Sequence, residues 1–273
     1  MTPALMKMPV FLLKECNMDL ELSGKKVLVT GASQGIGKAT IISFLEEGAD
    51  IVMVSRGTEK LDALANELKK KYSKERVISS ICDCTKESDL KSLRNLIDDR
   101  WGGIDIVVSN VGDGRSVDDT LPNSNQWEKT WKSNFDSALY TARTFLPMLE
   151  NSNGNLLFVS SIAGIDAFGA PVDYSTAKAA IIALSKNMSR KLVNVRVNVV
   201  APGNVYFEGG SWDNKIKADK SKVNDMIKSN VPINRFASPQ EIADSILFIC
   251  SARASFITGS TLVIDGGQTV GGL

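Results

Sequence analysis

The chain alternates between short apolar runs and longer segments in which apolar residues recur every three or four positions. The apolar runs are residues 27–29, 51–54, 77–81, 104–108, 156–159, 195–200 and 262–264. Runs of this length predict strands, and the lack of strict polar alternation in most of them favours a sheet that is buried on both faces. The longer segments predict helices that connect parallel strands. The pattern therefore predicts an α/β protein in three layers, with a seven-stranded parallel sheet between two layers of helices.

One long segment, residues 204–231, falls outside this alternation. It is polar over residues 208–211 and helix-like from Asp213. The chain has no internal repeat, no low-complexity tract and no linker between domains. With 273 residues and 43% hydrophobic content, it is long enough for one large core and short for two. We therefore expect a single domain over residues 20–273, preceded by a poorly packed N-terminal extension, residues 1–19.

Composition narrows the classes of function. A formal net charge of +1 gives no electrostatic reason to expect binding to nucleic acid or to an anionic membrane. The chain has no histidine, which excludes a histidine-ligated metal and a histidine general base. The four cysteines are not spaced as a CxxC redox pair or a zinc knuckle, so no metal is expected. The apolar run 9–13 is too short for a signal or membrane segment, and we expect a cytoplasmic protein with reduced thiols.

A glycine-rich turn joins the first predicted strand to a helix. The turn reads Gly31-Ala32-Ser33-Gln34-Gly35-Ile36-Gly37, between a strand over residues 25–30 and helical periodicity over residues 38–45. Glycines allow a tight turn and let the backbone approach a pyrophosphate, whose charge meets free N–H groups and the positive end of the helix dipole. The segment therefore predicts a dinucleotide cradle, with an ordinary strand-to-helix turn as the alternative.

Tyr174 and Lys178 are four residues apart in a helical segment, which places a phenol and an ammonium on one face. A unit charge at ~4 Å in a medium of effective dielectric ~20 is worth ~4 kcal/mol, or roughly three pKa units. We therefore expect Lys178 to lower the pKa of Tyr174, so that the phenol exchanges protons near neutral pH. A surface pair on an amphipathic helix is the alternative.

These features, taken in order along the chain, resemble the short-chain dehydrogenase/reductase family in its compact single-domain branch, from about Leu20 to the C-terminus. The matching motifs are Thr30-Gly31 with Gly35 and Gly37, Ser109-Asn110-Val111-Gly112 for the family's NNAG motif, Asn134, Ser161 with its structural neighbour Ser160, Tyr174 with Lys178, Pro202-Gly203, and Asp265-Gly266-Gly267. The resemblance implies a Rossmann fold with strand order 3-2-1-4-5-6-7. It also implies an NAD(P)-dependent oxidoreductase that interconverts a carbonyl and a secondary alcohol, similar to 3-oxoacyl-carrier-protein reductases.

The catalytic residues that the resemblance implies are Asn134, Ser161, Tyr174 and Lys178. Tyr174 would donate a proton to the substrate oxygen, which Ser161 polarises. Lys178 would lower the pKa of the phenol and hold the nicotinamide ribose. Asn134 would support a water that leads from this lysine to solvent. A non-catalytic dinucleotide sensor and a nucleotide-sugar epimerase are the alternative classes, but the sensor usually loses the tyrosine or lysine and the epimerase usually has a longer chain.

The resemblance also implies a set of cofactor-binding residues. They are Gly31, Ser33, Gln34, Gly35, Ile36, Gly37, Ser55, Arg56, Asp83, Cys84, Asn110, Val111, Gly112, Tyr174, Lys178, Pro202, Gly203 and Val205. Asp83 would contact adenine, with a helix-capping role before Thr85 as the alternative. Ser109 and Val111 depart from NNAG, which changes packing beneath the cofactor but keeps Asn110. After Pro202-Gly203 many relatives place a threonine that touches the cofactor, where this chain has 204–207, Asn-Val-Tyr-Phe.

The end of the second strand predicts the choice of cofactor. An acid at Ser55 would bind both ribose hydroxyls and repel a 2′-phosphate, and that acid is absent. Arg56 supplies a forked, permanently charged donor that suits a phosphate, and Ser55 adds a hydroxyl. A solvent-facing Arg56 is the alternative, and Gln34 stands where many NADP-binding relatives have a basic residue. We expect NADP(H) to be preferred, with NAD(H) as the alternative.

The family resemblance implies a small-molecule carbonyl or alcohol substrate, a substrate lid and subunit pairing. Residues 204–231 would form the lid, with a surface insertion as the alternative. The helices over about 127–149 and 174–191 carry more apolar surface than one sheet face can cover, including Phe135, Leu139, Phe145, Ile181, Ile182 and Leu184. The resemblance implies that these helices pair between subunits in a two-fold arrangement, with a further contact through the last strand, so we expect a homotetramer. The motifs do not choose among 3-oxoacyl, sugar, polyol and secondary-alcohol substrates.

Overall fold

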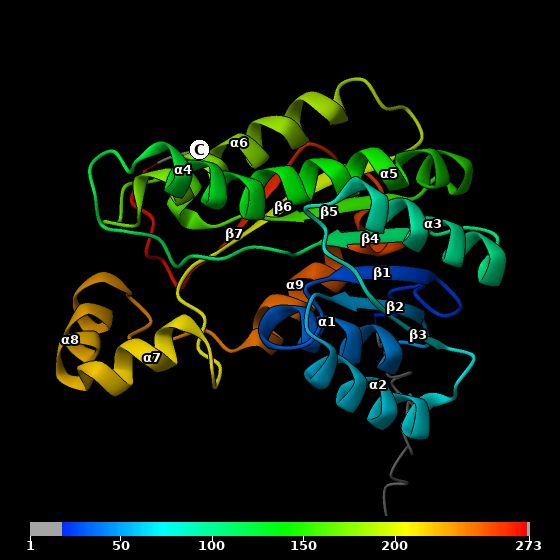
Figure 1. The fold of residues 1–273 in the computed structure, drawn as a ribbon, viewed down its shortest axis with the longest axis horizontal. Helices are drawn as coiled ribbons and strands as arrows, with labels where there is room; N and C mark the ends of the chain where they lie inside the picture. Colours follow the sequence, from blue (N-terminus) through cyan, green and yellow to red (C-terminus); the bar gives the residue numbers. More distant parts are fainter. Residues whose placement is uncertain (1–17, 272–273) are drawn as a thin grey trace, which may run out of the picture.

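The computed structural model describes residues 18–271, so most of the predicted N-terminal extension lies outside the described residues. Seven parallel strands form one sheet in the order β3-β2-β1-β4-β5-β6-β7, which confirms the predicted topology (Figure 1). The strands are β1 Lys26–Thr30, β2 Asp50–Ser55, β3 Val77–Ile81, β4 Ile106–Ser109, β5 Asn155–Val159, β6 Arg196–Pro202 and β7 Thr261–Ile264. The predicted strand 104–108 begins two residues later, because Asp105 caps the start of β1 by accepting the Lys26 N–H at 2.8 Å.

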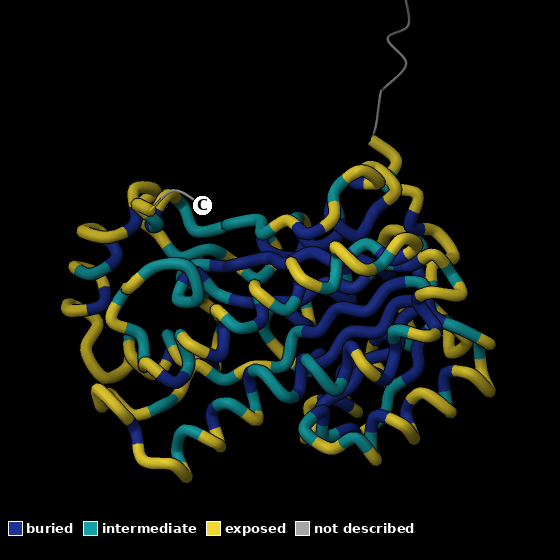
Figure 2. Tube along the Cα trace, turned by 90° about the horizontal axis from the view of Figure 1, so that it is seen from above, coloured by how far each residue is buried: buried dark blue, intermediate teal, exposed yellow. Residues whose placement is uncertain are grey.

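The continuous apolar runs follow from burial on both faces. In β1, Val27 and Val29 face one core cluster while Leu28 faces the other, and all three are fully buried. β1 pairs with β2 through Val27↔Ile51 and with β4 through Val27↔Ile106. It therefore lies inside the sheet, at the point where the strand order reverses. Figure 2 shows the buried backbone concentrated in the middle of the molecule, and the edge strand β7 is only partly buried.

Helices cover both faces of the sheet. One layer contains α1 Gly35–Glu46, α2 Thr58–Tyr72 and α9 Pro239–Cys250. The other contains α3 Glu87–Trp101, α5 Ser137–Ser152 and α6 Val172–Ser189 (Figure 1). Short 3₁₀ turns lie at Ile162–Gly164 and Ala252–Ala254. In the part of the chain that the structure describes, no helix has the length and apolar character needed to cross a membrane.

The predicted helix over about 127–149 is longer and less regular than expected. It consists of α4 Ser124–Trp131, a π-helical turn Lys132–Asp136 and α5. A π turn inserts an extra residue into a helix, and such turns are frequent at functional sites. Phe145 of α5 and Ile181 of α6, which we expected on the outer surfaces of their helices, are instead buried in the core of the subunit. The expectation that they pair between subunits is therefore wrong.

The long segment after β6 contains two helices that belong to neither layer. They are α7 Ser211–Ala218 and α8 Lys220–Asn230, drawn beside the sheet in Figure 1. The first begins two residues before the predicted Asp213, and Asp213 is buried, where it accepts the Gly209 N–H at 2.9 Å. An isolated bridge between Val205 and Ala237 closes the base of the segment.

Candidate active site

A cleft of about 500 Å³ lies at the carboxyl ends of the central strands, the place where open α/β sheets bind ligands. All but two of the residues predicted to bind cofactor or catalyse line it. The exceptions are Gly37 and Asn134, which lie behind the cleft wall. The topology therefore brings the separated motifs to one site.

The glycine turn has the backbone that its sequence requires. Gly31 and Gly35 have φ angles of +65° and +56°, in the left-handed region that favours glycine. A Cβ on Gly37 would lie 2.3 Å from the Gly31 carbonyl oxygen, so no larger residue fits there. Asn110 braces the turn from β4, since its Nδ2 donates to the carbonyls of Thr30 at 3.0 Å and Gly31 at 3.2 Å. Asn110, which keeps the asparagine of the NNAG motif, thus stabilises the glycine turn.

The start of α1 is chemically suited to a pyrophosphate. Gln34, the N-cap residue, makes no side-chain hydrogen bond to the helix, and the first turn carries no acid. Its N–H groups therefore lack a side-chain partner and are available to an anion. The ring of Phe207 lies over this turn, because a Cβ on Gly35 would come within 2.8 Å of Phe207 Cε1. Phe207 thus presents an apolar ring near the glycine turn, in the segment where many relatives have a polar threonine.

The adenosine end of the cleft lies between the ends of β2 and β3. Ser55 is buried and its hydroxyl donates to the Gly57 carbonyl at 2.8 Å, so its proton is engaged. Arg56 is exposed and lines the cleft. Asp83 lines it as well, but its Oδ1 accepts the Thr85 N–H at 3.1 Å and hydroxyl at 2.8 Å. Asp83 therefore closes a turn at Thr85 and lines the cleft, but it does not cap the following helix, whose N-cap residue is Lys86.

The two neighbouring serines have different surroundings. Ser160 is buried and its hydroxyl donates to the Lys178 carbonyl at 2.8 Å, which fastens β5 to α6. Ser161 lines the cleft and accepts the Ala163 N–H at 3.1 Å. A Cβ on Gly164 would lie 2.6 Å from the Lys178 carbonyl carbon, so the 3₁₀ turn packs tightly against α6. Both serines line the cleft, but the hydroxyl of Ser160 is buried and engaged by Lys178, so Ser161 is the better placed of the two to meet a ligand.

Lys178 lines the cleft from the same face of α6 as Tyr174. Its side chain is 3% exposed, and its ammonium donates to the Val159 carbonyl at 3.1 Å. The ammonium is 5.7 Å from the centroid of the Tyr174 ring. A Cβ on Gly112 would lie 2.8 Å from Lys178 Nζ and 3.0 Å from Asn134 Oδ1. Glycine at this position therefore leaves room for the ends of both side chains.

The expectation that Lys178 lowers the pKa of Tyr174 is wrong for this structure. Burial raises the pKa of Tyr174 above its usual 10, and the charge of Asp113 adds to this, against a hydrogen bond with Ser161 that lowers it. Burial also lowers the pKa of Lys178 to about 8. Spacing on a helix set the face that the two side chains share, but not the distance between their polar ends. Loss of hydration therefore outweighs the attraction between them.

Asn134 is fully buried in the π turn and holds the loop after β4. Its Oδ1 accepts the Asp113 N–H and its Nδ2 donates to the Asp113 carbonyl, both at 3.0 Å. The same Nδ2 donates to the Thr130 carbonyl at 3.0 Å. Ser133, its neighbour, lines the cleft instead. Asn134 therefore acts on the cleft through the peptide of Asp113.

Sequence reasoning missed a polar network that anchors the start of α6. Asp173 is 1% exposed, and its Oδ1 accepts the N–H of Tyr174 at 2.8 Å. Its Oδ2 accepts the Ser116 hydroxyl, which also accepts from Gln126 Nε2 at 3.0 Å. The available signal was an acid directly before the tyrosine, in the first turn of a helix. Asp113 and Arg115, which form a 2.8 Å ion pair on the cleft wall, were missed as well.

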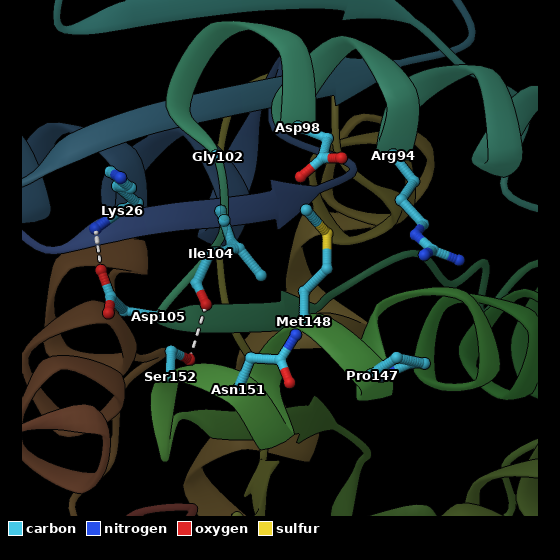
Figure 3. Close-up of a pocket in the computed structure, with 11 residues that line it drawn as sticks. Lys26, Arg94, Asp98, Gly102, Ile104, Asp105, Pro147, Met148, Asn151 and Ser152 are labelled. Carbon is cyan, nitrogen blue, oxygen red and sulfur yellow. Dashed lines mark hydrogen bonds between the residues drawn. The ribbon is translucent and has the colours of Figure 1, made fainter.

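A second hollow, of about 340 Å³, lies at the opposite ends of the strands (Figure 3). It contains none of the predicted site residues, and its central polar groups are engaged in the fold. Asp105 accepts from Lys26, and the Ser152 hydroxyl donates to the Ile104 carbonyl at 2.8 Å. Within residues 18–271, no group of three or more cysteine, aspartate or glutamate side chains could hold a metal ion.

Comparisons with known proteins agree with this geometry. The family model described as enoyl-(acyl carrier protein) reductase matches residues 31–269. A 3-oxoacyl-[acyl-carrier-protein] reductase of Thermotoga maritima is 31% identical, over 92% of this chain and 100% of its own length. An uncharacterised oxidoreductase of Bacillus subtilis is 34% identical, over 92% and 98%. The solved structure of L-sorbose reductase of Gluconobacter frateurii, complexed with NADPH and L-sorbose, has a TM-score of 0.87 and 30% identity, over 93% and 100%.

We expect the stability of the wild-type protein relative to Lys178→Met to rise with pH. Burial lowers the pKa of Lys178 from 10.5 to about 8. Between these values the unfolded state binds the proton that the folded state has lost, so folding becomes more favourable as pH rises. Below the folded pKa the buried charge destabilises by about 3 kcal/mol, and above the unfolded pKa this penalty vanishes.

The measurement is denaturant unfolding of both proteins between about pH 7 and 10. Lys191→Met, at an exposed position, is the control and should show no such trend. A stability difference between wild type and Lys178→Met that stays constant across this range would contradict the lowered pKa.

Proposed function

The chain belongs to the short-chain dehydrogenase/reductase family of NAD(P)-dependent oxidoreductases, and on that premise we propose that it interconverts a carbonyl and a secondary alcohol, with NADP(H) preferred. The observation that carries the proposal is the convergence of Ser161, Tyr174 and Lys178 on the cleft that contains the glycine turn. The uncapped start of α1 and the glycines that admit no Cβ fit a dinucleotide in this cleft. Bound NADPH would supply the hydride.

In the direction of reduction, Tyr174 donates its phenolic proton to the substrate oxygen. Ser161, which is hydrogen-bonded to Tyr174, orients the same oxygen by donating its hydroxyl proton. Because burial raises the pKa of Tyr174, the phenol stays protonated at neutral pH and is ready to act as a general acid. Oxidation of an alcohol would need the phenolate and is therefore favoured at higher pH.

Lys178 and Asn134 support these groups from behind. A buried ammonium with a pKa of about 8 can pass a proton towards the site near neutral pH, with its carbonyl held by Ser160. Asn134 fixes the peptide of Asp113, whose loop forms one wall beside Tyr174. We retain the water path from Lys178 past Asn134 as part of the proposal.

Two substrate classes fit the reaction. The relative from Thermotoga maritima is named for 3-oxoacyl carrier-protein esters, which makes a 3-oxoacyl compound the first candidate. The substrate end of the cleft, however, is lined by Asp113, Arg115, Ser211 and Trp212, a mainly polar wall with one indole. Such a wall offers several hydrogen bonds to hydroxyl groups and favours a second candidate, a sugar or polyol. Rates with NADPH on a panel of 3-oxoacyl thioesters and keto sugars separate the two.

We propose further that residues 204–231 form a lid over the substrate. Their two helices lie outside both helical layers, and Phe207, Gly209 and Trp212 line the cleft from this segment. Trp212 packs on Phe236 with ring centroids 5.3 Å apart, which ties the lid to the approach of α9. We propose that residues 20–273 form a single domain that includes this lid. We also propose that the protein is cytoplasmic.

Replacement of Tyr174 by Phe should abolish turnover without abolishing cofactor binding. The variant lacks the proton donor but keeps the aromatic ring, so kcat should fall by at least ~100-fold while the Kd for NADPH changes little. Steady-state kinetics and fluorescence titration measure the two quantities. Ser161→Ala should also lower kcat strongly, whereas Ser160→Ala should mainly lower stability, by about 1 kcal/mol. Activity of Tyr174→Phe near the wild-type rate would remove Tyr174 from the mechanism.

The wild-type enzyme should prefer NADPH over NADH by at least ~10-fold in kcat/KM. Ser55→Asp combined with Arg56→Ile introduces an acid that repels the 2′-phosphate and removes the cation beside it, so the preference should collapse or invert. Kinetics with both cofactors in both proteins measure this. A wild-type preference for NADH would contradict the cofactor assignment and leave the reaction class intact.

We expect a homotetramer in solution, with a mass of about four times the 29.5 kDa of the chain. Trp127, Trp131 and Phe135 form a half-exposed aromatic row on α4 and the π turn, with centroids 6.5 and 5.0 Å apart. Phe256, next to the edge strand β7, is fully exposed. Both surfaces are apolar enough to pair between subunits. Light scattering that shows a stable monomer at micromolar concentration would refute this.

A further inference from the structure

Two cations lie near the adenosine end of the cleft without an acidic partner, Arg56 in the cleft and Lys60 in the hollow outside it. Arg56 and Lys60 are both exposed, and neither forms an ion pair with any residue in the part of the chain that the structure describes. Asp83 also lines the cleft, and its Oδ1 is engaged by Thr85. Two unpaired charges beside a polar cleft have an attraction for an anion that no side chain satisfies.

The position of Lys60 is set by a single contact. Its ammonium donates to Gln34 Oε1 at 2.9 Å, across 26 residues of sequence, because β1 and β2 lie side by side in the sheet. Gln34 lines the cleft and also an outer hollow of about 630 Å³, which Lys60 lines. The amide of Gln34 therefore forms a wall between the two spaces, and it holds the ammonium of Lys60 on the outer side.

The field of Arg56 reaches across the same end of the cleft. Burial raises the pKa of Asp83, but hydrogen bonds from Thr85 and the charge of Arg56 outweigh it and lower the pKa overall. Burial raises the pKa of Asp113 too, but hydrogen bonds and charge from Arg115, with a smaller effect of the charge of Arg56, lower it overall. An anion placed between Arg56 and Gln34 would therefore meet positive charge from two sides.

We propose that Lys60, held by Gln34, is the second cation of a phosphate-monoester subsite, and that with Arg56 it selects a dinucleotide that carries a 2′-phosphate. The inference rests on the proposed function, and it adds a specificity-determining residue outside the motifs. A phosphate monoester carries a charge of about −1.5 to −2 at pH 7, more than one guanidinium neutralises. A lysine that exchanges a neutral amide acceptor for a charged phosphate gains a stronger hydrogen bond.

The exchange needs little rearrangement. Lys60 is exposed on the first turns of α2, so rotation of its side chain carries the ammonium past Gln34 without moving the backbone. Lys38 lines the same outer hollow and is also exposed, but within residues 18–271 its ammonium makes no hydrogen bond to Gln34, to which only its backbone N–H donates, at the carbonyl. Lys38 is therefore a matched control for an effect of surface charge alone.

The experiment compares Lys60→Gln, Lys60→Arg and Lys38→Gln with wild type. Binding of 2′,5′-ADP and of 5′-AMP by calorimetry gives a readout that is independent of turnover, and kcat/KM is measured with NADPH and NADH. Lys60→Gln should weaken binding of 2′,5′-ADP about tenfold and 5′-AMP less than about twofold. Lys60→Arg should restore most of the affinity, and Lys38→Gln should match wild type. The kcat/KM for NADPH should fall by a similar factor, with NADH unchanged.

Equal weakening of 2′,5′-ADP and 5′-AMP in Lys60→Gln, or no weakening of either, would overturn the assignment of Lys60. The same loss in Lys38→Gln would also overturn it, because the effect would then belong to the general surface charge. A wild-type preference for NADH in kcat/KM would instead refute the proposed cofactor. The two failures are distinguishable, because the nucleotide comparison tests Lys60 and the wild-type kinetics test the cofactor.

Discussion

The site depends on the burial of one ammonium, Lys178, without a carboxylate beside it. A buried charge is costly unless it is paired or hydrogen-bonded, and here the Val159 carbonyl is the partner. Burial lowers the pKa of Lys178 to about 8, which brings its proton exchange close to neutral pH. The surrounding fold holds it in place: Ser160 fixes its carbonyl, and the missing side chain of Gly112 leaves room for its end. Under the proposed function, stability would be given up at the position where proton transfer needs a group with a pKa close to neutral pH.

The second constraint is the loop after β4, which the buried amide of Asn134 holds through the peptide of Asp113. The π turn places this amide, and the Asp173 network fixes the opposite side of the same loop through Ser116. Because Asp173 also accepts the N–H of Tyr174, the loop and the tyrosine are held by one carboxylate. A rigid wall beside the phenol follows, as preorganised catalysis requires.

Strand positions were predictable because a sheet that is buried on both faces leaves continuous apolar runs, and β4 alone began two residues late. The order of the strands was predicted from the family resemblance and not from these runs. The residues that line the cleft were predictable from motifs, because the backbone conformation of a dinucleotide-binding turn requires glycines at fixed positions. The pKa of Tyr174 was not, because spacing on a helix cannot show that Lys178 turns towards Val159. The π turn and the contact between Lys60 and Gln34 escaped as well, since both arise from tertiary packing.

The formal net charge of +1 conceals an uneven distribution along the cleft. At the adenosine end Arg56 and Gln34-bound Lys60 present positive charge, whereas at the substrate end Asp113 and Arg115 neutralise each other. A ligand matched to this field carries its negative charge at one end and a neutral reacting group at the other. A neutral carbonyl beside a protonated phenol gains the most from proton donation as its oxygen becomes negative. Under the proposed function, the charges would orient the ligand as well as bind it.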